Sequence, residues 1–318
     1  MLALGIDLGG TAIKTAVVDV TGDVVGTGEE KTPAKQGVDA CVEAMMAAAD
    51  EALGNAGIRK EHLKGAGIGV PGVVLPRQGL VVEVTNLEGW SNIPLRDIMA
   101  SRLGLRVELA NDANAAALGE VRFGAGKGVE NLVLFTLGTG IGGGVIINGK
   151  IVVGANGMGG EIGHTLIEKS RPRPCGCHKF GCLEAYAGAL GIVKRTHEAL
   201  AEDWQGHSAL HEYAEGDEGL EAKHVYELAK AGDFLAKDLI AQTAHALAMG
   251  IVNMLHTLDP DMILLAGGMT KAGDTFLEQV RSMVEELALP QVRKTPVNYG
   301  KLGNKAGCIG AAALVLPA

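Results

Sequence analysis

Three cysteines lie within eight residues of one another in the stretch PCGCHKFGCLE at 174–184. The C-x-C-x4-C spacing gathers three soft sulfur ligands, and thiolates in a reducing compartment favour zinc. A closed zinc site needs four ligands, so a histidine, a cysteine or a carboxylate from elsewhere must complete the set. The alternative is a group of three buried structural thiols. The spacing favours a metal site.

Several residues could supply the fourth zinc ligand. Cys41 and Cys308 are remote in sequence. His178 directly follows Cys177, which makes chelation by both awkward though feasible. His164 stands eleven residues before the first cysteine of the cluster and is free to fold back. A histidine that binds zinc through one ring nitrogen can donate a hydrogen bond through the other.

Glu161 and His164 lie three residues apart in GGEIGHT, where they can share a face. The flanking glycines disfavour a stable helix and predict a shaped turn. A carboxylate and an imidazole on such a turn suit recognition of hydroxyl groups. The alternative for His164 is a polar residue in an ordinary loop.

Asn111 and Asp112 follow a predicted strand and open the alanine-rich helix DANAAALGEV. Either residue could simply cap the helix, since Asn and Asp are favoured there. A carboxylate held at a helix start could also orient an attacking hydroxyl and accept its proton, which is what phosphoryl transfer requires.

Two glycine-rich turns could bind phosphate. GTGIGG at 138–143 matches G-x-G-x-x-G, but a strand follows it where a dinucleotide-binding motif requires a helix. In DLGGT at 7–11, Asp7 could hold a metal-bound water and Thr11 could donate a hydroxyl, with Lys14 three residues on. Either turn alone reads as an ordinary hairpin. Two at matching places favour phosphate binding through backbone amides.

The elements that carry these residues form a repeat. Strands are expected at 2–8, 12–20 and 24–30, and again at 131–137, 141–147 and 151–155. Each series is a meander with a glycine-rich first turn, which predicts duplicated domains. Helices are expected at 38–56, 94–103, 185–204, 222–231, 233–257 and 272–288. Residues 205–221 are expected to form a mobile surface excursion.

Two short strands are also expected, in KGAGIGVPG and RVELAN, and a strand within the mostly helical part, DMILLAGG at 261–268, ends in Gly267 and Gly268. The pair predicts either a plain turn into a helix or a flat backbone surface against which a planar base can lie.

Bulk properties narrow the class of protein. The 318 residues suit two domains. The net charge of −9, without a Lys/Arg cluster, argues against nucleic acid as a partner. No secretory signal or membrane-length apolar run is evident, and the cysteine usage favours the cytoplasm. Glycine, at 47 residues, is about twice as frequent as usual, which predicts tight turns and close approach to ligands.

Together these residues resemble the ROK family (repressor, open reading frame, kinase) of the hexokinase–actin superfamily. The motifs that carry the resemblance are DLGGT at 7–11, GVPG at 69–72, NLEGW at 86–90, NDANAA at 111–116, LGTGIGGG at 137–144, GEIGH at 160–164, CGCHKFGCLE at 175–184 and LAGG at 265–268. They keep the family's order and cover nearly the whole chain.

The resemblance implies an α/β fold in which two ribonuclease-H-like (actin-like ATPase) domains with mixed sheets flank a central cleft. The smaller domain would comprise 1–111 plus 303–318, and the larger 112–302. It also implies ATP with Mg²⁺ as co-substrate, a structural Zn²⁺, and transfer of phosphate to a hexose, most simply to the 6-hydroxyl of glucose.

The resemblance assigns roles residue by residue. Asp112 would be the general base. The sugar would be bound by Gly72, Asn86, Asn111, Asp112, Glu161, His164 and Glu184. ATP would be bound by Asp7, Gly9, Gly10, Thr11, Lys14, Gly138, Thr139, Gly140, Gly267 and Gly268. Zinc would be bound by His164, Cys175, Cys177 and Cys182.

One position departs from the family pattern: His178 stands where a glycine usually follows the second cysteine. It could disturb the loop or compete with His164 for the metal, and we expect neither to abolish the site.

The alternatives within the same chemistry are a kinase for N-acetylmannosamine, N-acetylglucosamine or fructose, and polyphosphate or ADP as donor. A sugar-responsive transcription factor of this family would carry a helix-turn-helix before the kinase-like body. The first strand is expected to begin by residue 2, so the expectation is that this sequence has no room for one. A sugar-binding protein without catalysis is disfavoured by the intact Asp112, Thr11 and Glu161. The family expectation is a homodimer or a dimer of dimers.

Overall fold

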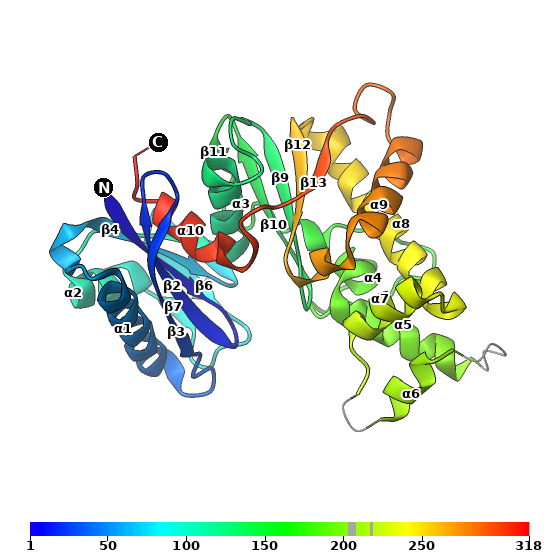
Figure 1. The fold of residues 1–318 in the computed structure, drawn as a ribbon, viewed down its shortest axis with the longest axis horizontal. Coiled ribbons are helices and arrows are strands. Elements are labelled where there is room, and N and C mark those ends of the chain that lie inside the picture. The colour runs from blue at the N-terminus through cyan, green and yellow to red at the C-terminus, as the bar shows by residue number, and fades with distance from the viewer. Residues whose placement is uncertain (203–207, 217–218, 318) are drawn as a thin grey trace. The chain divides into compact units, whose positions relative to one another are not determined.

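The computed structural model describes residues 1–202, 208–216 and 219–317 (Figure 1). It is an α/β protein with two five-stranded sheets and one three-stranded sheet. The first sheet has the order β3-β2-β1-β4-β8. Its strands are β1 (Leu2–Leu8), β2 (Ala12–Asp19), β3 (Val24–Lys31), β4 (Leu63–Val70) and β8 (Val107–Asn111).

The first sheet is mixed. β1, β2 and β3 form an antiparallel meander, while β4 runs parallel to β1 and β8 parallel to β4. The register pairs Asp7 with Gly69, and Val70 with Asn111. The carboxyl ends of these parallel strands therefore bring Asp7 and Asn111 to one edge of the sheet.

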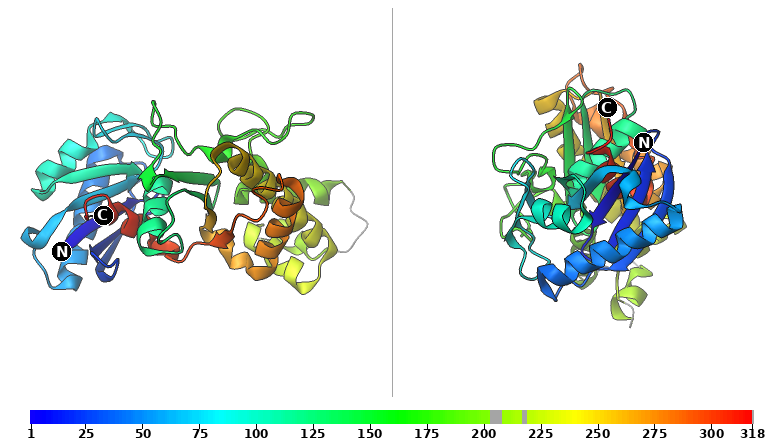
Figure 2. Two further views of the ribbon diagram at one scale, coloured as in Figure 1. Left: turned by 90° about the horizontal axis from the view of Figure 1, so that it is seen from above. Right: turned by 90° about the vertical axis from the view of Figure 1, so that its left-hand side faces the viewer.

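Helices cover both faces of this sheet. α1 (Gly37–Ala56) and α2 (Leu95–Leu103) lie on one face, and α10 (Ala306–Ala313) lies on the other beside α3 (Asp112–Phe123) (Figures 1 and 2). α1 ends as predicted at Gly57, which is left-handed with φ 66°. Because both faces are covered, the central strands are almost continuously apolar.

Glycines let α10 lie directly on the sheet. A Cβ at Gly5 would fall 1.8 Å from the carbonyl oxygen of Cys308, and one at Gly67 would fall 1.8 Å from that of Ala311. Only a residue without a side chain fits between strand and helix there. The glycine surplus thus serves contacts between backbones inside the fold as well as turns.

The second five-stranded sheet has the order β11-β10-β9-β12-β13, which repeats the order of the first. Its strands are β9 (Leu132–Leu137), β10 (Ile141–Ile147), β11 (Lys150–Ile151), β12 (Met262–Ala266) and β13 (Val297–Tyr299). The predicted repeat is confirmed. The predicted strand 151–155 is wrong in extent, because the chain leaves the sheet after Ile151 and turns at Gly154 (φ 76°).

The small sheet was not predicted. It joins β5 (Val73–Leu75), β6 (Leu80–Glu83) and β7 (Ser91–Ile93) in that order. These strands have three or four residues and show no clear apolar alternation.

The later part of the chain is mostly helical, as predicted. Its helices are α4 (Glu184–Ala187), α5 (Ala189–Ala201), α6 (Leu210–Glu215), α7 (Ala222–Ala231), α8 (Phe234–Leu258) and α9 (Asp274–Leu287).

Two predictions in this helical part need correction. The predicted helix 185–204 is interrupted at Gly188, which has an extended backbone with ψ 155°. The predicted surface excursion 205–221 contains α6 and the fully buried Leu210. Residues 203–207 and 217–218 lie outside the described part of the chain.

Packing divides the chain into two compact units. The first unit comprises 1–134, 144–160 and 300–318, and the second comprises 135–143 and 161–299. α3 belongs to the first unit because it packs on α10. This division differs from the domain boundaries predicted at 112 and 303, which stay a prediction. Among the described residues, no helix combines the length and apolar character needed to cross a membrane.

Candidate functional site

The start of α3 carries two of the predicted site residues. Asn111 caps the helix, its side-chain oxygen accepting hydrogen bonds from the amides of Ala113 (3.0 Å) and Asn114 (3.2 Å). The Asn111 amide group donates to the Gly72 carbonyl oxygen at 3.2 Å. Asp112 accepts from the Ala113 amide at 2.8 Å. Asn111 therefore caps α3, and the cap fixes the side chains of Asn111 and Asp112 beside the Gly72 loop.

Asp7 lies close enough to Asp112 for the two carboxylates to interact. The pKa of Asp7 is raised to about 6, mainly by burial and further by the negative charge of Asp112, while the Lys14 ammonium group opposes both effects. A cation placed beside this carboxylate pair would relieve the repulsion. The first predicted glycine turn thus has the electrostatics of a metal-binding edge.

Asn86 approaches the same turn from the loop after β6. A Cβ at Gly10 would fall 2.6 Å from the side-chain nitrogen of Asn86, so Gly10 leaves room for that side chain. The turn is closed by the Gly9 amide, which donates to the Ala12 carbonyl oxygen at 3.0 Å, and by Thr32, whose hydroxyl donates to the Gly9 carbonyl oxygen at 2.7 Å.

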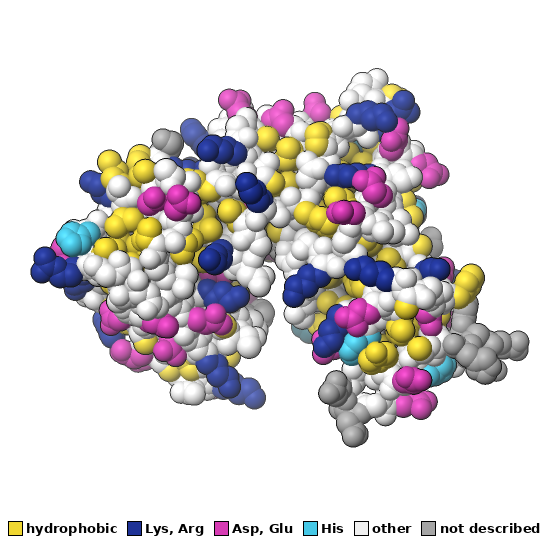
Figure 3. Space-filling view, viewed as in Figure 1, with side chains coloured by type: hydrophobic (Ala, Val, Ile, Leu, Met, Phe, Trp, Pro, Cys, Tyr) yellow, Lys and Arg dark blue, Asp and Glu magenta, His cyan; other side chains and the backbone are white. Residues whose placement is uncertain are grey.

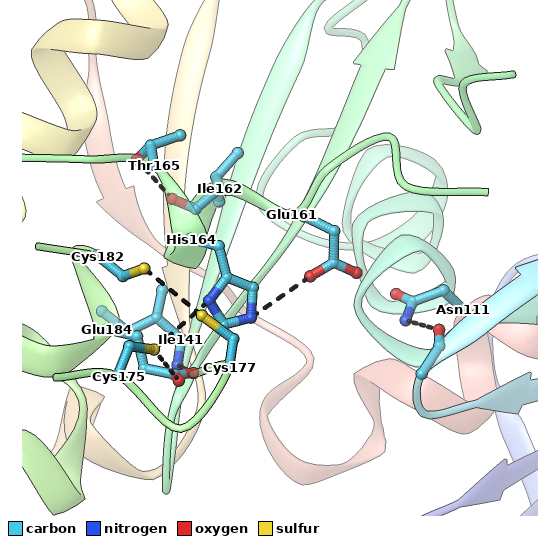
Figure 4. A network of polar contacts seen from close by, with 11 residues as sticks. Asn111, Ile141, Glu161, Ile162, His164, Thr165, Cys175, Cys177, Cys182 and Glu184 are labelled. Atoms are coloured by element: carbon cyan, nitrogen blue, oxygen red, sulfur yellow. Dashed lines mark hydrogen bonds and ion pairs between the residues drawn. The ribbon is translucent and has the colours of Figure 1, made fainter. Parts of the chain in front are cut away.

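In the second unit, His164, Cys175, Cys177 and Cys182 form one cluster. Their ligand atoms all lie within 4.8 Å of one another. Nδ1 of His164 is 3.7 Å from Sγ of Cys175, and the Sγ atoms of Cys177 and Cys182 are also 3.7 Å apart (Figure 4). Sulfur ligands 2.3 Å from a tetrahedral zinc ion lie about 3.8 Å from each other. The donor set and its spacing therefore fit a zinc ion.

The predicted turn around His164 is a short 3-10 helix, Ile162–His164. It directs Nδ1 towards the cysteines, while Nε2 lies 3.9 Å from a carboxylate oxygen of Glu161 (Figure 4). Both side chains keep about a third of their surface exposed (34% and 35%), so they can still meet a ligand.

His178 is not one of the four clustered side chains found among the described residues. Its backbone is left-handed, with φ 62°, the conformation that the family's glycine adopts without cost. Its amide closes the loop by donating to the Cys175 carbonyl oxygen at 3.1 Å. His178 therefore retains the loop geometry at the cost of backbone strain, and its side chain is exposed.

A pocket of about 660 Å³ lies in the second unit and is lined by Gly138, Thr139 and Gly268. Its apolar wall includes Leu190 and Met269. The volume is within the range of small-molecule sites.

Three lysines also line this pocket, namely Lys223, Lys230 and Lys271. Figure 3 shows Lys and Arg side chains gathered over α7, which carries two of them. Sequence reasoning missed these lysines, because no motif marks α7.

The predicted site residues thus fall into groups that are each compact within their own unit. The first unit holds Asp7, Gly9, Gly10, Thr11, Lys14, Gly72, Asn86, Asn111 and Asp112. The second unit holds Gly138, Thr139, Gly140, Glu161, His164, Cys175, Cys177, Cys182, Glu184, Gly267 and Gly268. The roles assigned to them stay predictions.

The model of the ROK family matches residues 3–318. The chain belongs to the ROK family. It is 39% identical to a glucokinase of Halalkalibacterium halodurans, over 98% of this chain and 94% of the relative. It is 32% identical to a putative xylose repressor of a Caldicellulosiruptor species, over 99% of this chain and 78% of that relative.

Among solved structures, this ROK protein is similar to a ROK family glucokinase from Streptomyces griseus in complex with glucose and AMPPNP. The TM-score is 0.83 and the identity 34%, covering 99% of each chain. The fold is thus the actin-like ATPase fold of ROK sugar kinases, as predicted.

Proposed function

We propose that this chain is an ATP-dependent glucokinase that phosphorylates the 6-hydroxyl of glucose. The observation that carries the proposal is the full-length similarity to glucokinases together with Asp112 at the start of α3, beside the carboxylate of Asp7. Phosphoryl transfer needs a carboxylate in this setting and little other covalent chemistry from the protein.

Asp112 is the general base in this proposal. It orients the 6-hydroxyl and accepts its proton as the bond to phosphorus forms. Asn111 and Gly72, which are hydrogen-bonded to each other, hold neighbouring hydroxyls, as do Asn86, Glu161 and His164. The 3-10 helix turns Nε2 of His164 away from the cysteines, which leaves it able to donate to a sugar oxygen.

ATP binds through the two glycine turns. The Gly9 and Gly138 amides close their own turns, so the amides of Gly10, Thr11, Thr139 and Gly140 face phosphates. The pocket lined by Gly268, Leu190 and Met269 receives the adenosine. Mg²⁺ would be held at the Asp7 edge and would neutralise charge on the phosphates. Lys14 adds a positive charge there.

A structural zinc ion would be held by His164 and the three cysteines. It would fix the orientation and tautomer of the His164 ring, so that the second ring nitrogen is free to donate to the sugar.

A kinase assay tests the proposal across glucose, mannose, fructose, N-acetylmannosamine and N-acetylglucosamine, with ATP, ADP and polyphosphate as donors. We expect the highest kcat/KM for glucose with ATP. A higher kcat/KM for an N-acetylhexosamine would identify that sugar as the substrate in place of glucose. If no sugar is phosphorylated, the kinase function is refuted.

A second candidate is a sugar-responsive regulator, favoured by the similarity to a putative xylose repressor. Sequence-specific DNA binding that changes with sugar would support it. The domain boundaries, the dimeric state and the cytoplasmic location predicted from the sequence stay part of the proposal, and light scattering on the purified protein measures the oligomeric state.

A further inference from the structure

The carboxylate of Glu184 makes two contacts inside the second unit. One oxygen, Oε2, accepts a hydrogen bond from the Ile141 amide at 2.9 Å. The other, Oε1, lies 3.4 Å from Sγ of Cys175 (Figure 4). Ile141 is the first residue of β10, directly after the Gly138–Gly140 turn. Glu184 therefore links the cysteine cluster to that turn.

The Gly138–Gly140 turn is built on the segment that Glu184 begins. The amides at the start of α5 donate to it: Ala189 to the Gly138 carbonyl oxygen at 3.1 Å, and Leu190 to the Thr139 carbonyl oxygen at 3.2 Å. These bonds fix the carbonyl side of the turn. The bond from Ile141 to Glu184 fixes its far end.

Gly140 is fitted to the Glu184 carboxylate. A Cβ at this position would fall 2.1 Å from Oε2 of Glu184, so the two groups are in direct contact. A turn of two glycines and a threonine has little side-chain packing of its own and a high conformational entropy when free. A charge-assisted hydrogen bond at its end is thus a major restraint on its shape.

We propose that Glu184 is a positioning residue for the nucleotide: it holds the Gly138–Gly140 turn in the shape that binds phosphate and ties that shape to the Cys175 loop. The proposal rests on the proposed function, since it takes this turn as a phosphate-binding element. It differs from the sugar-binding role predicted for Glu184, because it concerns affinity for the nucleotide when no sugar is present.

The test is calorimetric binding of a non-hydrolysable ATP analogue with Mg²⁺ and without sugar. We expect Glu184→Ala to raise the Kd of the analogue about tenfold, since a charge-assisted hydrogen bond is lost. Glu184→Gln keeps an oxygen for the Ile141 amide but not the charge, so its analogue Kd should rise clearly less than that of Glu184→Ala. Glu161→Ala is the matched control, expected to lose glucose affinity and keep analogue affinity.

Glu184→Asp provides a second variant should the alanine variant not fold. It keeps the charge but withdraws it from Ile141 by one methylene group, so analogue affinity should fall as in Glu184→Ala. Hydrogen exchange of the Ile141 amide should quicken in the Ala and Asp variants and stay slow in the Gln variant.

The outcomes separate this proposal from the proposed function. The positioning role would be overturned by an unchanged analogue Kd in Glu184→Ala or Glu184→Asp, or by equal losses of analogue affinity in the Ala and Gln variants. Neither result would contradict the proposed kinase function. A wild-type protein that phosphorylates no sugar would refute the proposed function, and the exchange of the Ile141 amide would still report whether Glu184 holds the turn.

Discussion

The start of α3 separates helix capping, done by Asn111, from the chemistry proposed for Asp112. The adjacent Asn111 caps α3 with two backbone hydrogen bonds, so Asp112 does not have to act as the cap. Its carboxylate is placed by the helix start and by its own bond to the Ala113 amide. A site residue whose neighbour stabilises the helix can be changed without unfolding the element.

We therefore expect Asp112→Asn to fold normally and to lose kcat by about 10²–10⁴-fold, the usual contribution of a general base. Glucose affinity should change far less, since the amide can still hydrogen-bond to a hydroxyl. Steady-state kinetics and a thermal melt measure both quantities. Near-normal turnover in the folded variant would remove Asp112 from the mechanism.

Asp7 should make stability depend on pH. Its pKa is raised from 3.8 to about 6, so the folded state keeps a proton that the unfolded state releases near pH 4. The stability that this proton provides is complete below about pH 4 and is lost as the pH rises through 6.

Asp7→Asn removes the free-energy cost of ionising this carboxyl group in the folded protein. Above pH 7 the variant should be more stable than wild type by about 1–2 kcal/mol, a value reduced because Asp7 is partly exposed. Near pH 4 the two proteins should be equally stable. Urea unfolding at both pH values measures the difference, and a variant less stable than wild type at pH 7.5 would contradict the electrostatic account.

At the scale of elements, the loop 164–184 contains little regular secondary structure. Isolated bridges pair Leu166 with Cys182 and Pro174 with Phe180. Single backbone hydrogen bonds, such as that from the Ile167 amide to the Gly181 carbonyl oxygen (2.9 Å), join its two arms. A zinc ion bound as proposed would add a four-ligand cross-link to this loop.

Removal of metal by a chelator should lower the Tm by several degrees and weaken glucose binding in parallel. We expect about one zinc ion per chain in freshly purified, reduced protein, measured by elemental analysis. A zinc-free protein with full glucose affinity would exclude the four-ligand site.

The contact between β4 and α10 gives a second prediction at this scale. Gly67→Ala places a methyl carbon 1.8 Å from the Ala311 carbonyl oxygen, so strand and helix must separate. We expect a loss of about 2–4 kcal/mol in unfolding free energy, comparable to other overpacked cores. Gly54→Ala is the matched control.

Gly54 lies in α1 with nothing within 4 Å of its would-be Cβ, so alanine there should stabilise by about 0.5–1 kcal/mol. Denaturant unfolding of the two variants gives the comparison. Equal effects would show that the α10 contact does not limit packing.

At the scale of the whole molecule, the repeat was predictable because both meanders place strands and glycine turns in the same order. The start of α3 and the cysteine cluster were predictable because chemistry restricts their residue types. The three-stranded sheet was not, since strands as short as Val73–Leu75 carry no periodicity. The lysines over the pocket and the Glu184–Ile141 bond were also missed, because both depend on contacts between segments far apart in sequence.

Sugar binding should stabilise the whole chain. At a glucose concentration one hundred times the Kd, mass action adds about 2.7 kcal/mol to the unfolding free energy. Xylose, which lacks the sixth carbon, is the matched control and should shift the Tm much less. An equal shift by xylose would favour the regulator over the kinase.

Gly5 and Gly67, which lie under α10, also limit which substitutions this sequence can accept during evolution. A bulky side chain in a core can often be accommodated when its neighbour mutates to a smaller one. At Gly5 and Gly67 the obstacle is backbone, which no single second mutation can shrink. Lineages that share this fold should therefore vary freely on the outer face of α1 and hold these strand positions fixed, even though neither glycine contacts a substrate group.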